Sequence, residues 1–412
     1  MRILQVNHPQ DIKQIMRAIG VDPYGIEIML PKSLTYLIRI NSLSNITANI
    51  LKQEMLSLGA DAAVARGALT GKSKKTDCLL MGNLAQFSRL KQKLALQPFG
   101  LDKLAGELSG ALANYQSERF TLDLGRYKLN LGLRTYLMAI LNLTPDSFSG
   151  NGLYAAQYAI RNTHDAIRAR QDYIVNRVEQ LIKDGADIVD VGGESSRPGA
   201  RPVSVKEELN RTIPAIKALT KKIKVPISID TYKPEVAKAA LDNGAVMVND
   251  ITALRNPKMA KVVSRYKAPV VIMHMQGSPR TMQKKPHYLS LIDEIIEYLD
   301  RAINRAQAGG IDRDKIIIDP GIGFGKSAEH NLEIIKRLKD FKVLGRPILV
   351  GPSRKAFIGK VLNAQPDERV FGTISASLLA AKSGAKILRV HDVKEVKQAL
   401  RVFEAIESQC IC

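Results

Sequence analysis

Between Met138 and the C-terminus, the chain repeats one pattern eight times: a short apolar run that ends in a polar side chain. The first run, MAILN, stops at Asn142 and is followed by a loop rich in proline and serine. Short apolar runs bounded by loops are typical of buried strands. The seven other runs are Asp187–Gly193, Pro226–Thr231, Val246–Asp250, Pro269–His274, Lys315–Pro320, Pro347–Gly351 and Lys386–His391.

Helical patterns lie between these runs. Their apolar residues recur about every three or four positions, as in an amphipathic helix. Examples are Asn176–Asp184, Lys206–Thr220, Glu235–Asn243, Leu289–Ala308 and Asn331–Lys339. A strand followed by a helix, eight times over, predicts an α/β fold that closes into a parallel (β/α)8 TIM barrel.

Polar residues end nearly all of the predicted strands, and in this barrel the active site lies at the C-terminal ends of the strands. Contact with solvent would suffice to explain any one polar strand end. It does not explain why carboxamides, carboxylates and a cation end nearly every strand, so we expect these residues to form a site. They are Asn142, Asp190, Asp230, Asn249, His274, Asp319 and Arg389.

The barrel does not account for the whole chain. Its 412 residues exceed the roughly 250 that one barrel needs, so a second domain is expected. We predict a small α/β domain over residues 1–118, with strands at Ile3–Val6, Leu37–Ile40 and Cys78–Met81, and the barrel over 119–412. The alternating segment Phe120–Asn130 predicts a hairpin that closes the N-terminal end of the barrel.

The net charge of +21 at first suggests a nucleic-acid partner. The excess is +7 in residues 1–130 and +14 in the remainder, roughly in proportion to length, and no basic tail or nucleic-acid motif is present. We therefore predict a solvated basic surface and no nucleic-acid partner. Such a surface also helps to attract anionic small substrates.

The remaining composition favours a cytoplasmic protein. No apolar run approaches the roughly 18 residues of a membrane span, and the polar N-terminal residues Arg2, His8 and Asp11 leave no room for a signal peptide. The three cysteines, Cys78, Cys410 and Cys412, fit no metal or disulfide pattern. We predict a reducing compartment and no membrane partner.

Three of the predicted strand ends suit a flat heterocycle. Asp230, Asn249 and Asp319 offer two carboxylates and a carboxamide, which can pair with the N–H and C=O groups of an aminopyrimidinone edge. A buried carboxylate without a partner is costly, so the alternative role of these groups is to pair with a cation inside the barrel. Lys355 is a candidate partner for Asp319.

A second group of residues suits an anion. Arg197, Lys355 and Arg389 are cationic, and arginine presents a planar fork of donors to phosphate oxygens. Further donors come from Ser195, Ser196 and His391.

A heterocycle site beside an anion site predicts a phosphorylated or diphosphorylated heterocyclic substrate. Asn142 can hold Mg²⁺ through its side-chain oxygen, because this ion takes few protein oxygens alongside phosphate and water. No nucleophile–base pair stands out, which favours positioning and electrostatic stabilisation over covalent catalysis. His274 is either a catalytic or a structural histidine.

These motifs, in this order, resemble dihydropteroate synthases over roughly residues 120–412. They read MAILNLTPDSFS, DIVDVGGESSRPGA, PISIDTY, VMVNDIT, VVIMHMQGSPRTM, IIIDPGIGFGK, LVGPSRKAFIG and LRVHDV. The resemblance implies a transferase of folate biosynthesis. Such an enzyme condenses (7,8-dihydropterin-6-yl)methyl diphosphate with p-aminobenzoate to give 7,8-dihydropteroate and diphosphate.

The resemblance also implies roles for individual residues. The pterin would be held by Asp230, Asn249, Asp319 and Lys355, in a pocket lined by Asp190, Met273, Gly351 and Phe324. The diphosphate and its Mg²⁺ would be bound by Asn142, Ser196, Arg197, Arg389 and His391. The p-aminobenzoate, with which sulfonamides compete in this family, would lie near Arg197, Pro198, Lys355 and Ala356. Catalysis would rest on Lys355, Arg389, His391 and Asn142, by a dissociative path in which diphosphate leaves before the amine attacks.

The chain departs from the family pattern in three places. SFSGNG replaces SFSDGG, so the loop aspartate is missing at Gly150; Ser196 stands in GESSRPG where threonine is commoner; and Ala356 replaces a serine in SRKA. The stretch from Gly150 to Asp184 is also longer than usual. None of these changes removes a residue expected to bind pterin or diphosphate.

The sequence is compatible with two alternatives. A related pterin-dependent methyltransferase would lack the SRK and RVH cations, which this chain has. A catalytically silent barrel kept as a binding or scaffold protein is compatible with the altered loop at Gly150. The family also leads us to expect a homodimer formed through barrel helices.

Overall fold

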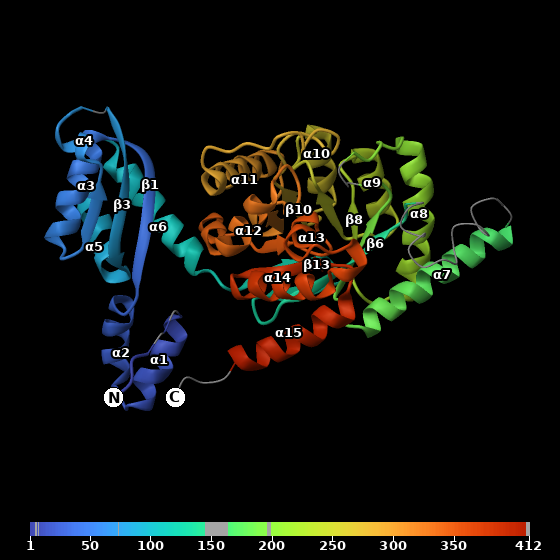
Figure 1. Ribbon diagram of the computed structural model, residues 1–412, viewed down its shortest axis with the longest axis horizontal. Helices are drawn as coiled ribbons and strands as arrows, with labels where there is room; N and C mark the ends of the chain where they lie inside the picture. Colours follow the sequence, from blue (N-terminus) through green and yellow to red (C-terminus); the bar gives the residue numbers. More distant parts are fainter. Residues whose placement is uncertain (5, 7, 73, 145–163, 196–198, 409–412) are drawn as a thin grey trace. The chain divides into compact units, whose positions relative to one another are not determined.

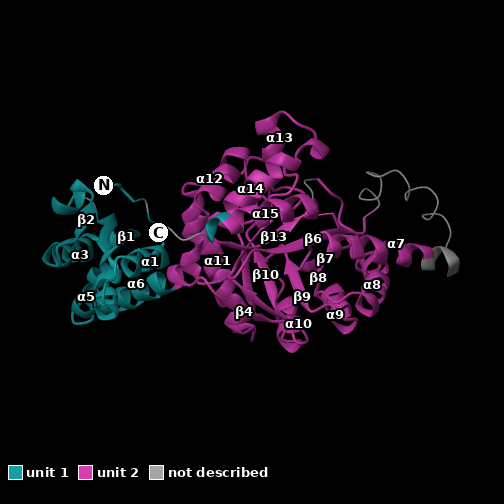
Figure 2. Cartoon of the chain, turned by 90° about the horizontal axis from the view of Figure 1, so that it is seen from below, with its two compact units in different colours: residues 1–113, 406–412 teal, residues 114–405 magenta. Residues whose placement is uncertain are grey.

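The computed structural model describes residues 1–412 except 5, 7, 73, 145–163, 196–198 and 409–412. The chain divides into two compact units (Figure 2), Met1–Ala113 with Ile406–Cys412 and Asn114–Ala405. The first division falls five residues before the expected boundary at 118, and the last residues of the chain cluster with the N-terminal unit.

The N-terminal unit is a three-stranded antiparallel sheet in the order β1-β3-β2. Buried residues of α3, α5 and α6 pack on the sheet and form a small core of their own. The elements are α1 (Pro9–Ala18), α2 (Pro23–Met29), β1 (Thr35–Ser44), α3 (Asn45–Ser57), β2 (Asp61–Val64), α4 (Arg66–Leu69), β3 (Lys75–Asn83), α5 (Leu84–Leu94) and α6 (Leu101–Gln116).

One predicted strand of this unit is wrong. Ile3, Leu4 and Val6 belong to no strand, and Ile3 is 96% exposed. A short apolar run becomes a strand only where its backbone pairs with a neighbour. The sheet instead includes β2, which pairs with β3 and whose alternating pattern was too short to be predicted.

The second unit is the predicted TIM barrel, and the fold class is confirmed. Eight parallel strands close in the order β6-β7-β8-β9-β10-β11-β12-β13, with β13 pairing back to β6. They are β6 (Tyr136–Asn142), β7 (Ile188–Gly192), β8 (Ile227–Asp230), β9 (Met247–Asp250), β10 (Val270–Met273), β11 (Ile316–Asp319), β12 (Ile348–Val350) and β13 (Ala385–Val390).

Helices surround the strands (Figure 1), and their apolar faces pack against the outward-facing strand residues in the largest core of the molecule. They are α7 (His164–Lys183), α8 (Val205–Lys222), α9 (Pro234–Asp242), α10 (Pro257–Arg265), α11 (Leu291–Ala308), α12 (Ala328–Lys336), α13 (Ala356–Leu362), α14 (Val370–Lys382) and α15 (Val393–Glu407). In the described part of the chain, none of the helices has both the length and the apolar character needed to cross a membrane.

The hairpin expected over Phe120–Asn130 consists of β4 (Phe120–Asp123) and β5 (Lys128–Leu131), which pair antiparallel. Leu122, Leu124, Leu129 and Leu131 are buried against the inward-facing apolar residues of the barrel strands. The hairpin therefore closes the N-terminal end of the barrel, and the opposite end is left for the site.

Candidate active site

A polar layer inside the barrel forms the floor of the site. Seven strands each place one buried apolar residue in the layer that the hairpin covers: Met138, Ile188, Met247, Val271, Ile317, Leu349 and Ile387. Side chains alternate between the two faces of a strand, so the residue two positions further along also points inward. Those next residues are Ile140, Asp190, Asn249, Met273, Asp319, Gly351 and Arg389. Strand periodicity thus brings together side chains that are far apart in sequence.

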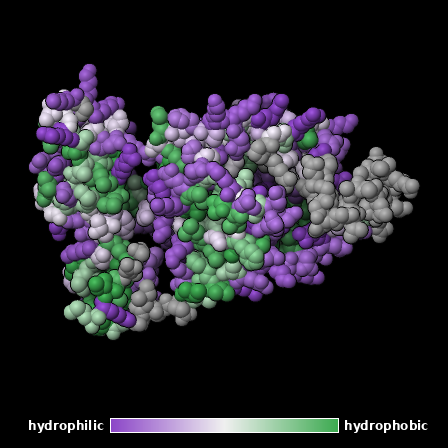
Figure 3. Space-filling view, in the orientation of Figure 1, coloured by the Kyte–Doolittle hydropathy of each residue, from purple (hydrophilic) through white to green (hydrophobic). Residues whose placement is uncertain are grey.

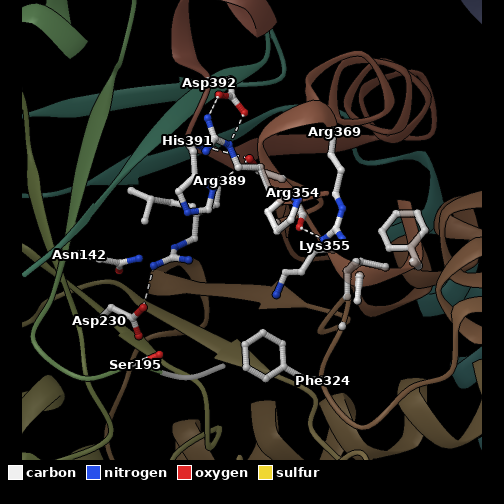
Figure 4. A pocket seen from close by; sticks show the side chains of 18 of the residues that line it. Asn142, Ser195, Asp230, Phe324, Arg354, Lys355, Arg369, Arg389, His391 and Asp392 are labelled. Atoms are coloured by element: carbon white, nitrogen blue, oxygen red, sulfur yellow. Dashed lines mark hydrogen bonds and ion pairs between the residues drawn. The ribbon is translucent and has the colours of Figure 1, made fainter. Parts of the chain in front are cut away.

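Arg389 is the centre of this layer. Its Nε donates to Asp190 Oδ2 at 2.6 Å and its Nη2 donates to Asp230 Oδ2 at 2.7 Å. Asn249 Nδ2 donates to the same Asp190 oxygen at 3.0 Å. Among the described residues, Arg389 Nη1 has no hydrogen-bond partner, so this donor remains for a ligand anion. Figure 4 shows the guanidinium beside Asn142, with a dashed line to Asp230.

Burial shapes the ionisation of the two candidate pterin carboxylates. Desolvation raises the pKa of Asp230, although the charge of Arg389 opposes the rise. The guanidinium offsets the rise only in part, because it serves two carboxylates, Asp190 as well as Asp230. Desolvation also raises the pKa of Asp319 to about 6, against a backbone hydrogen bond from Gly321 and the charge of Lys355. Both groups are thus tuned towards neutral pH.

Lys355 extends across the pocket towards Phe324 (Figure 4). Its Nζ lies 4.2 Å from the centroid of the Phe324 ring, within the range of a cation–π contact. Lys355 precedes the first residue of α13, and Phe324 lies in the loop after β11. A cation and an aromatic face from two strand ends therefore meet beside Asp319.

His391 is a neutral donor and not a cation. Its backbone N–H donates to Ser353 Oγ at 3.2 Å, and Ser353 Oγ lies 3.0 Å from His391 Nδ1. Because the serine oxygen already accepts from the backbone, its hydroxyl is free to donate to Nδ1, which places the ring proton on Nε2. Desolvation and the nearby Arg389 lower the pKa of His391 to about 3.

His274 is structural. It is buried, and its ring packs edge-on against Tyr298 with centroids 4.8 Å apart. Its Nδ1 lies 2.8 Å from Nζ of Lys326, a lysine that also donates to the carbonyl of Phe324 at 3.0 Å. Desolvation lowers the pKa of His274 to about 2, so the ring is neutral.

A single pocket of about 1650 Å³ collects most of the predicted site residues. Those in its wall are Asn142, Ser195, Asp230, Asn249, Met273, Asp319, Phe324, Gly351, Lys355, Ala356, Arg389 and His391. The predicted place of Asp190 in this wall is wrong. Asp190 is fully buried beneath the pocket, because Arg389 and Asn249 hydrogen-bond to its carboxylate and cover it.

Three predicted residues, Ser196, Arg197 and Pro198, lie outside the described residues, as does Gly150. The contributions expected of them to the diphosphate and amine sites stay predictions.

The donor set suits Mg²⁺ only as a companion of a phosphorylated ligand. The described residues contain no group of three or more His, Cys, Asp or Glu that could hold a metal. Asn142 offers one amide oxygen at the end of β6, in the same pocket as Arg389 and His391. Since Mg²⁺ is often held by one or two protein oxygens together with substrate phosphates, this arrangement fits a substrate-bound ion.

Several residues that support the site had no separate signal in the sequence. Ser353, Arg354, Lys326, Asp392 and Arg369 either line the pocket or hold residues that do. Four of them lie within two positions of a predicted residue, inside the motifs GFGK, GPSRKAF and LRVHD. Adjacency to a motif was therefore the only signal, and it does not say which way a side chain points.

Comparisons with known proteins agree with this geometry. The family described as pterin binding enzyme matches residues 138–391. The dihydropteroate synthase of Synechocystis sp. is 44% identical over 288 residues, which cover 69% of this chain and 94% of that protein. The probable bifunctional folylpolyglutamate synthase/dihydropteroate synthase of Halobacterium salinarum is 38% identical over 97% of this chain, which spans 46% of that longer protein.

Solved structures show the same barrel. Xanthomonas albilineans dihydropteroate synthase with 4-aminobenzoic acid is 41% identical, with a TM-score of 0.63, and the match covers 71% of this chain and 99% of that one. Yersinia pestis dihydropteroate synthase in a sulfonamide drug complex is 38% identical, also with a TM-score of 0.63, over 70% and 100% of the two chains.

Proposed function

The chain belongs to the family of pterin binding enzymes, and from this membership we propose how its residues work. Its function is that of a dihydropteroate synthase, the transferase that joins a dihydropterin-methyl group to p-aminobenzoate in folate biosynthesis. One observation carries the assignment of roles: Asp230, Asn249, Asp319, Lys355 and Arg389 converge from five strand ends on one pocket.

The floor of the pocket binds the pterin. The ionised carboxylates of Asp230 and Asp319 accept hydrogen bonds from the N–H groups of the ring, and Asn249 offers a carboxamide between them. Met273 and Phe324 belong to one hydrophobic cluster, which supplies an apolar wall. Buried polar groups that all find partners in the ligand give selectivity for a ring with this donor pattern, because other rings leave them unpaired.

The diphosphate lies at the opposite side of the pocket. Arg389 Nη1 and the Nε2–H of His391 donate to its oxygens. Ser195 lines the same pocket. The next two residues of the motif, Ser196 and Arg197, lie outside the described residues and are expected from the family resemblance to complete the set. Asn142 would hold Mg²⁺ through its amide oxygen, and such an ion would supply positive charge beside the leaving diphosphate.

The reaction breaks the bond between the pterin methylene carbon and the diphosphate oxygen before the new bond to nitrogen forms. Arg389 and His391 stabilise the charge that develops on the departing oxygen. The cationic pterin that results is held by the carboxylates of Asp230 and Asp319. The neutral amine of p-aminobenzoate then attacks, and its excess proton leaves to solvent or diphosphate. Lys355, with its stem beside the pterin, marks the boundary with the amine site.

Dihydropteroate formation tests this proposal directly. Purified protein is given pterin-methyl diphosphate and Mg²⁺, with and without p-aminobenzoate, and diphosphate and dihydropteroate are measured. We expect product with the parent protein and a loss of about 100-fold or more in Arg389→Ala and Lys355→Ala. Tight pterin binding without product would favour the catalytically silent barrel.

We also propose a homodimer through α13 and α14. Figure 3 shows an apolar patch over α14. Phe371 is 77% exposed, and Val361, Leu362 and Leu379 are also exposed on these helices. Exposed apolar patches of this kind mark interaction surfaces. Sedimentation should give a dimer for the parent protein and a monomer for Phe371→Asp. A dimer in both would place the interface elsewhere.

A further inference from the structure

Arg354, in the loop between β12 and α13, has a backbone conformation that is unusual for its residue type. Its φ is +56°, in the left-handed region. For a residue with a side chain this region is unfavourable, and such residues persist where the surrounding structure fixes them, often at functional sites. The interactions that fix Arg354 therefore show what the loop is built to hold.

The backbone N–H and carbonyl of Arg354 are both held by side chains of α14 and of its N-cap residue, Arg369. Its N–H donates to Thr373 Oγ1 at 3.0 Å, and its carbonyl accepts from Arg369 Nη1 at 3.1 Å. Thr373 is fully buried. Arg369 lies so close to α13 that a Cβ at Gly359 would come within 2.3 Å of its Nη2. The glycine is what allows this arginine to reach the loop.

The side chain of Arg354 is held by the end of the next strand. Its Nε donates to Asp392 Oδ2 at 3.1 Å and its Nη2 to Asp392 Oδ1 at 2.5 Å, a two-pronged arginine–carboxylate pair. Nη1 donates to Asp367 Oδ1 at 3.0 Å. Figure 4 shows the guanidinium turned to Asp392, whereas Lys355 extends towards Phe324.

Two parallel links thus join the loop after β12 to the segment after β13. Ser353 is bonded to His391, and Arg354 is bonded to Asp392. Lys355 directly follows Ser353 and Arg354 in the loop after β12. His391 lies beside Asp392 in the segment after β13. A shift of either segment would therefore move a residue that faces the pterin and one that faces the diphosphate relative to each other.

We propose that Arg354 is a positioning residue that fastens the loop after β12 to Asp392 and so sets Lys355 and His391 at their working distance. This inference rests on the proposed roles of Lys355 and His391. Its chemistry is indirect, because the guanidinium is committed to two carboxylates. Misplacing catalytic groups by about 1 Å can reduce a rate by about 100-fold, so the effect should be visible in kcat.

The test compares Arg354→Met and Asp392→Asn with a matched control, Arg337→Met. Arg337 also pairs with two carboxylates, Glu333 and Asp340, but at the C-terminal end of the outer helix α12. We expect kcat for dihydropteroate formation to fall by about 10- to 100-fold in the first two variants and to stay unchanged in the control. The double variant should be no slower than the slower single variant, because both changes break one link. Arg354→Lys should recover only part of the rate, since it lacks the fork.

A merely structural role would lower the melting temperature and leave kcat of the folded protein intact. Folded Arg354→Met with kcat and KM within about twofold of the parent would overturn the proposal. If Arg354→Met does not fold, the nearly isosteric Asp392→Asn decides in the same way.

A second measurement separates this inference from the proposed function. If the parent protein makes no dihydropteroate, the proposed function fails, and binding of inorganic diphosphate with Mg²⁺ still tests the link through His391. Weaker binding in Arg354→Met than in Arg337→Met would support the link. Equal binding in the two variants and the parent would refute it.

Discussion

Arg389 Nη2 donates to Asp230 Oδ2 at 2.7 Å, so the cation expected to meet the diphosphate is bonded to a carboxylate expected to hold the pterin. The expected binding sites for the pterin and for the diphosphate therefore belong to one connected hydrogen-bond network. Asp190, buried below, accepts from both Arg389 and Asn249 and ties the network to the barrel interior. A substitution in the pterin site should therefore also alter diphosphate binding, and the reverse.

Removing this cation should destabilise the protein as well as inactivate it. In Arg389→Met, Asp190 and Asp230 remain in the barrel without their partner. Losing one member of a buried pair costs about 3–5 kcal/mol of unfolding free energy. The pKa of Asp230 is already raised by burial and should rise further, so protonation at pH 5 should relieve part of the deficit seen at pH 7. Urea unfolding at both pH values measures this; an equal deficit at both would contradict it.

Pterin binding should weaken below pH 6. Burial raises the pKa of Asp319 to about 6, and only the ionised carboxylate accepts from two N–H groups. Affinity should then fall by up to about tenfold per pH unit below 6. The same shift has the opposite sign for stability: a raised pKa stabilises the fold most below the unfolded value and less as pH rises through 6. Protonation of Asp319 therefore does not unfold the protein at low pH, so unfolding cannot account for the loss of pterin affinity there.

Calorimetric titration with pterin between pH 5 and 8 checks this prediction. Asp319→Asn should bind more weakly and lose the step near pH 6. A dependence that persists unchanged in the variant would instead belong to Asp230.

Diphosphate binding should show no histidine titration. The pKa of His391 is lowered to about 3, because burial and the charge of Arg389 disfavour its cationic form. The ring is therefore neutral from pH 5 to 8 and donates through Nε2. Ser353→Ala removes the hydroxyl that selects this tautomer, and we expect kcat to fall by about tenfold with little change in stability. A step near pH 6.5 in the diphosphate affinity that vanishes in His391→Gln would contradict this.

Much of the barrel could be predicted from sequence because its strands are buried on both sides. Runs such as Lys315–Pro320 and Pro269–His274 are nearly all apolar, and a polar residue marks the end of each. The N-terminal unit was harder. The apolar run Ile3–Val6 looks like a strand but finds no partner, whereas β2 is only four residues long and pairs with β3. Pairing depends on a neighbour that local sequence does not specify.

Site residues whose position depends only on where a strand ends could be predicted from the sequence. Residues whose role depends on the direction of the side chain could not. Asp230, Asn249 and Asp319 follow from strand periodicity. Asp190 obeys the same periodicity and lies in the same layer, but the side chains of Arg389 and Asn249 bond to its carboxylate and separate it from the pocket. Arg354 stands in the same motif as Lys355, yet its left-handed backbone turns its side chain to Asp392. The spacing of residues along the sequence specifies neither the burial of Asp190 nor the direction of the Arg354 side chain.

The hairpin should matter for stability and not for catalysis. Leu122 is 1% exposed and packs against the apolar layer of the barrel. Leu122→Ala leaves a cavity and should lower the unfolding free energy by about 2–5 kcal/mol, with KM unchanged in the folded protein. Leu133→Ala is the matched control, since Leu133 is 65% exposed. Denaturant unfolding and initial rates test both halves; a raised KM in Leu122→Ala would link the hairpin to the site.

Lys326 should make stability rise above neutral pH. It is buried beside His274, and desolvation lowers its pKa to about 7. Between pH 7 and about 10 the unfolded chain then carries a proton on this amine that the folded protein lacks. Stability rises with pH wherever the unfolded state binds more protons, by up to about 1.4 kcal/mol per pH unit for one group.

Urea unfolding of the parent protein, Lys326→Met and Lys360→Met at pH 7, 8 and 9 isolates this effect. Lys360 pairs with Glu329 on the surface, so its variant should show the same rise as the parent. Lys326→Met should be flatter, because the methionine has no proton to exchange. If all three curves rise in parallel, Lys326 is charged inside the fold, and its contacts with His274 and the Phe324 carbonyl must then stabilise an ammonium close to Asp319.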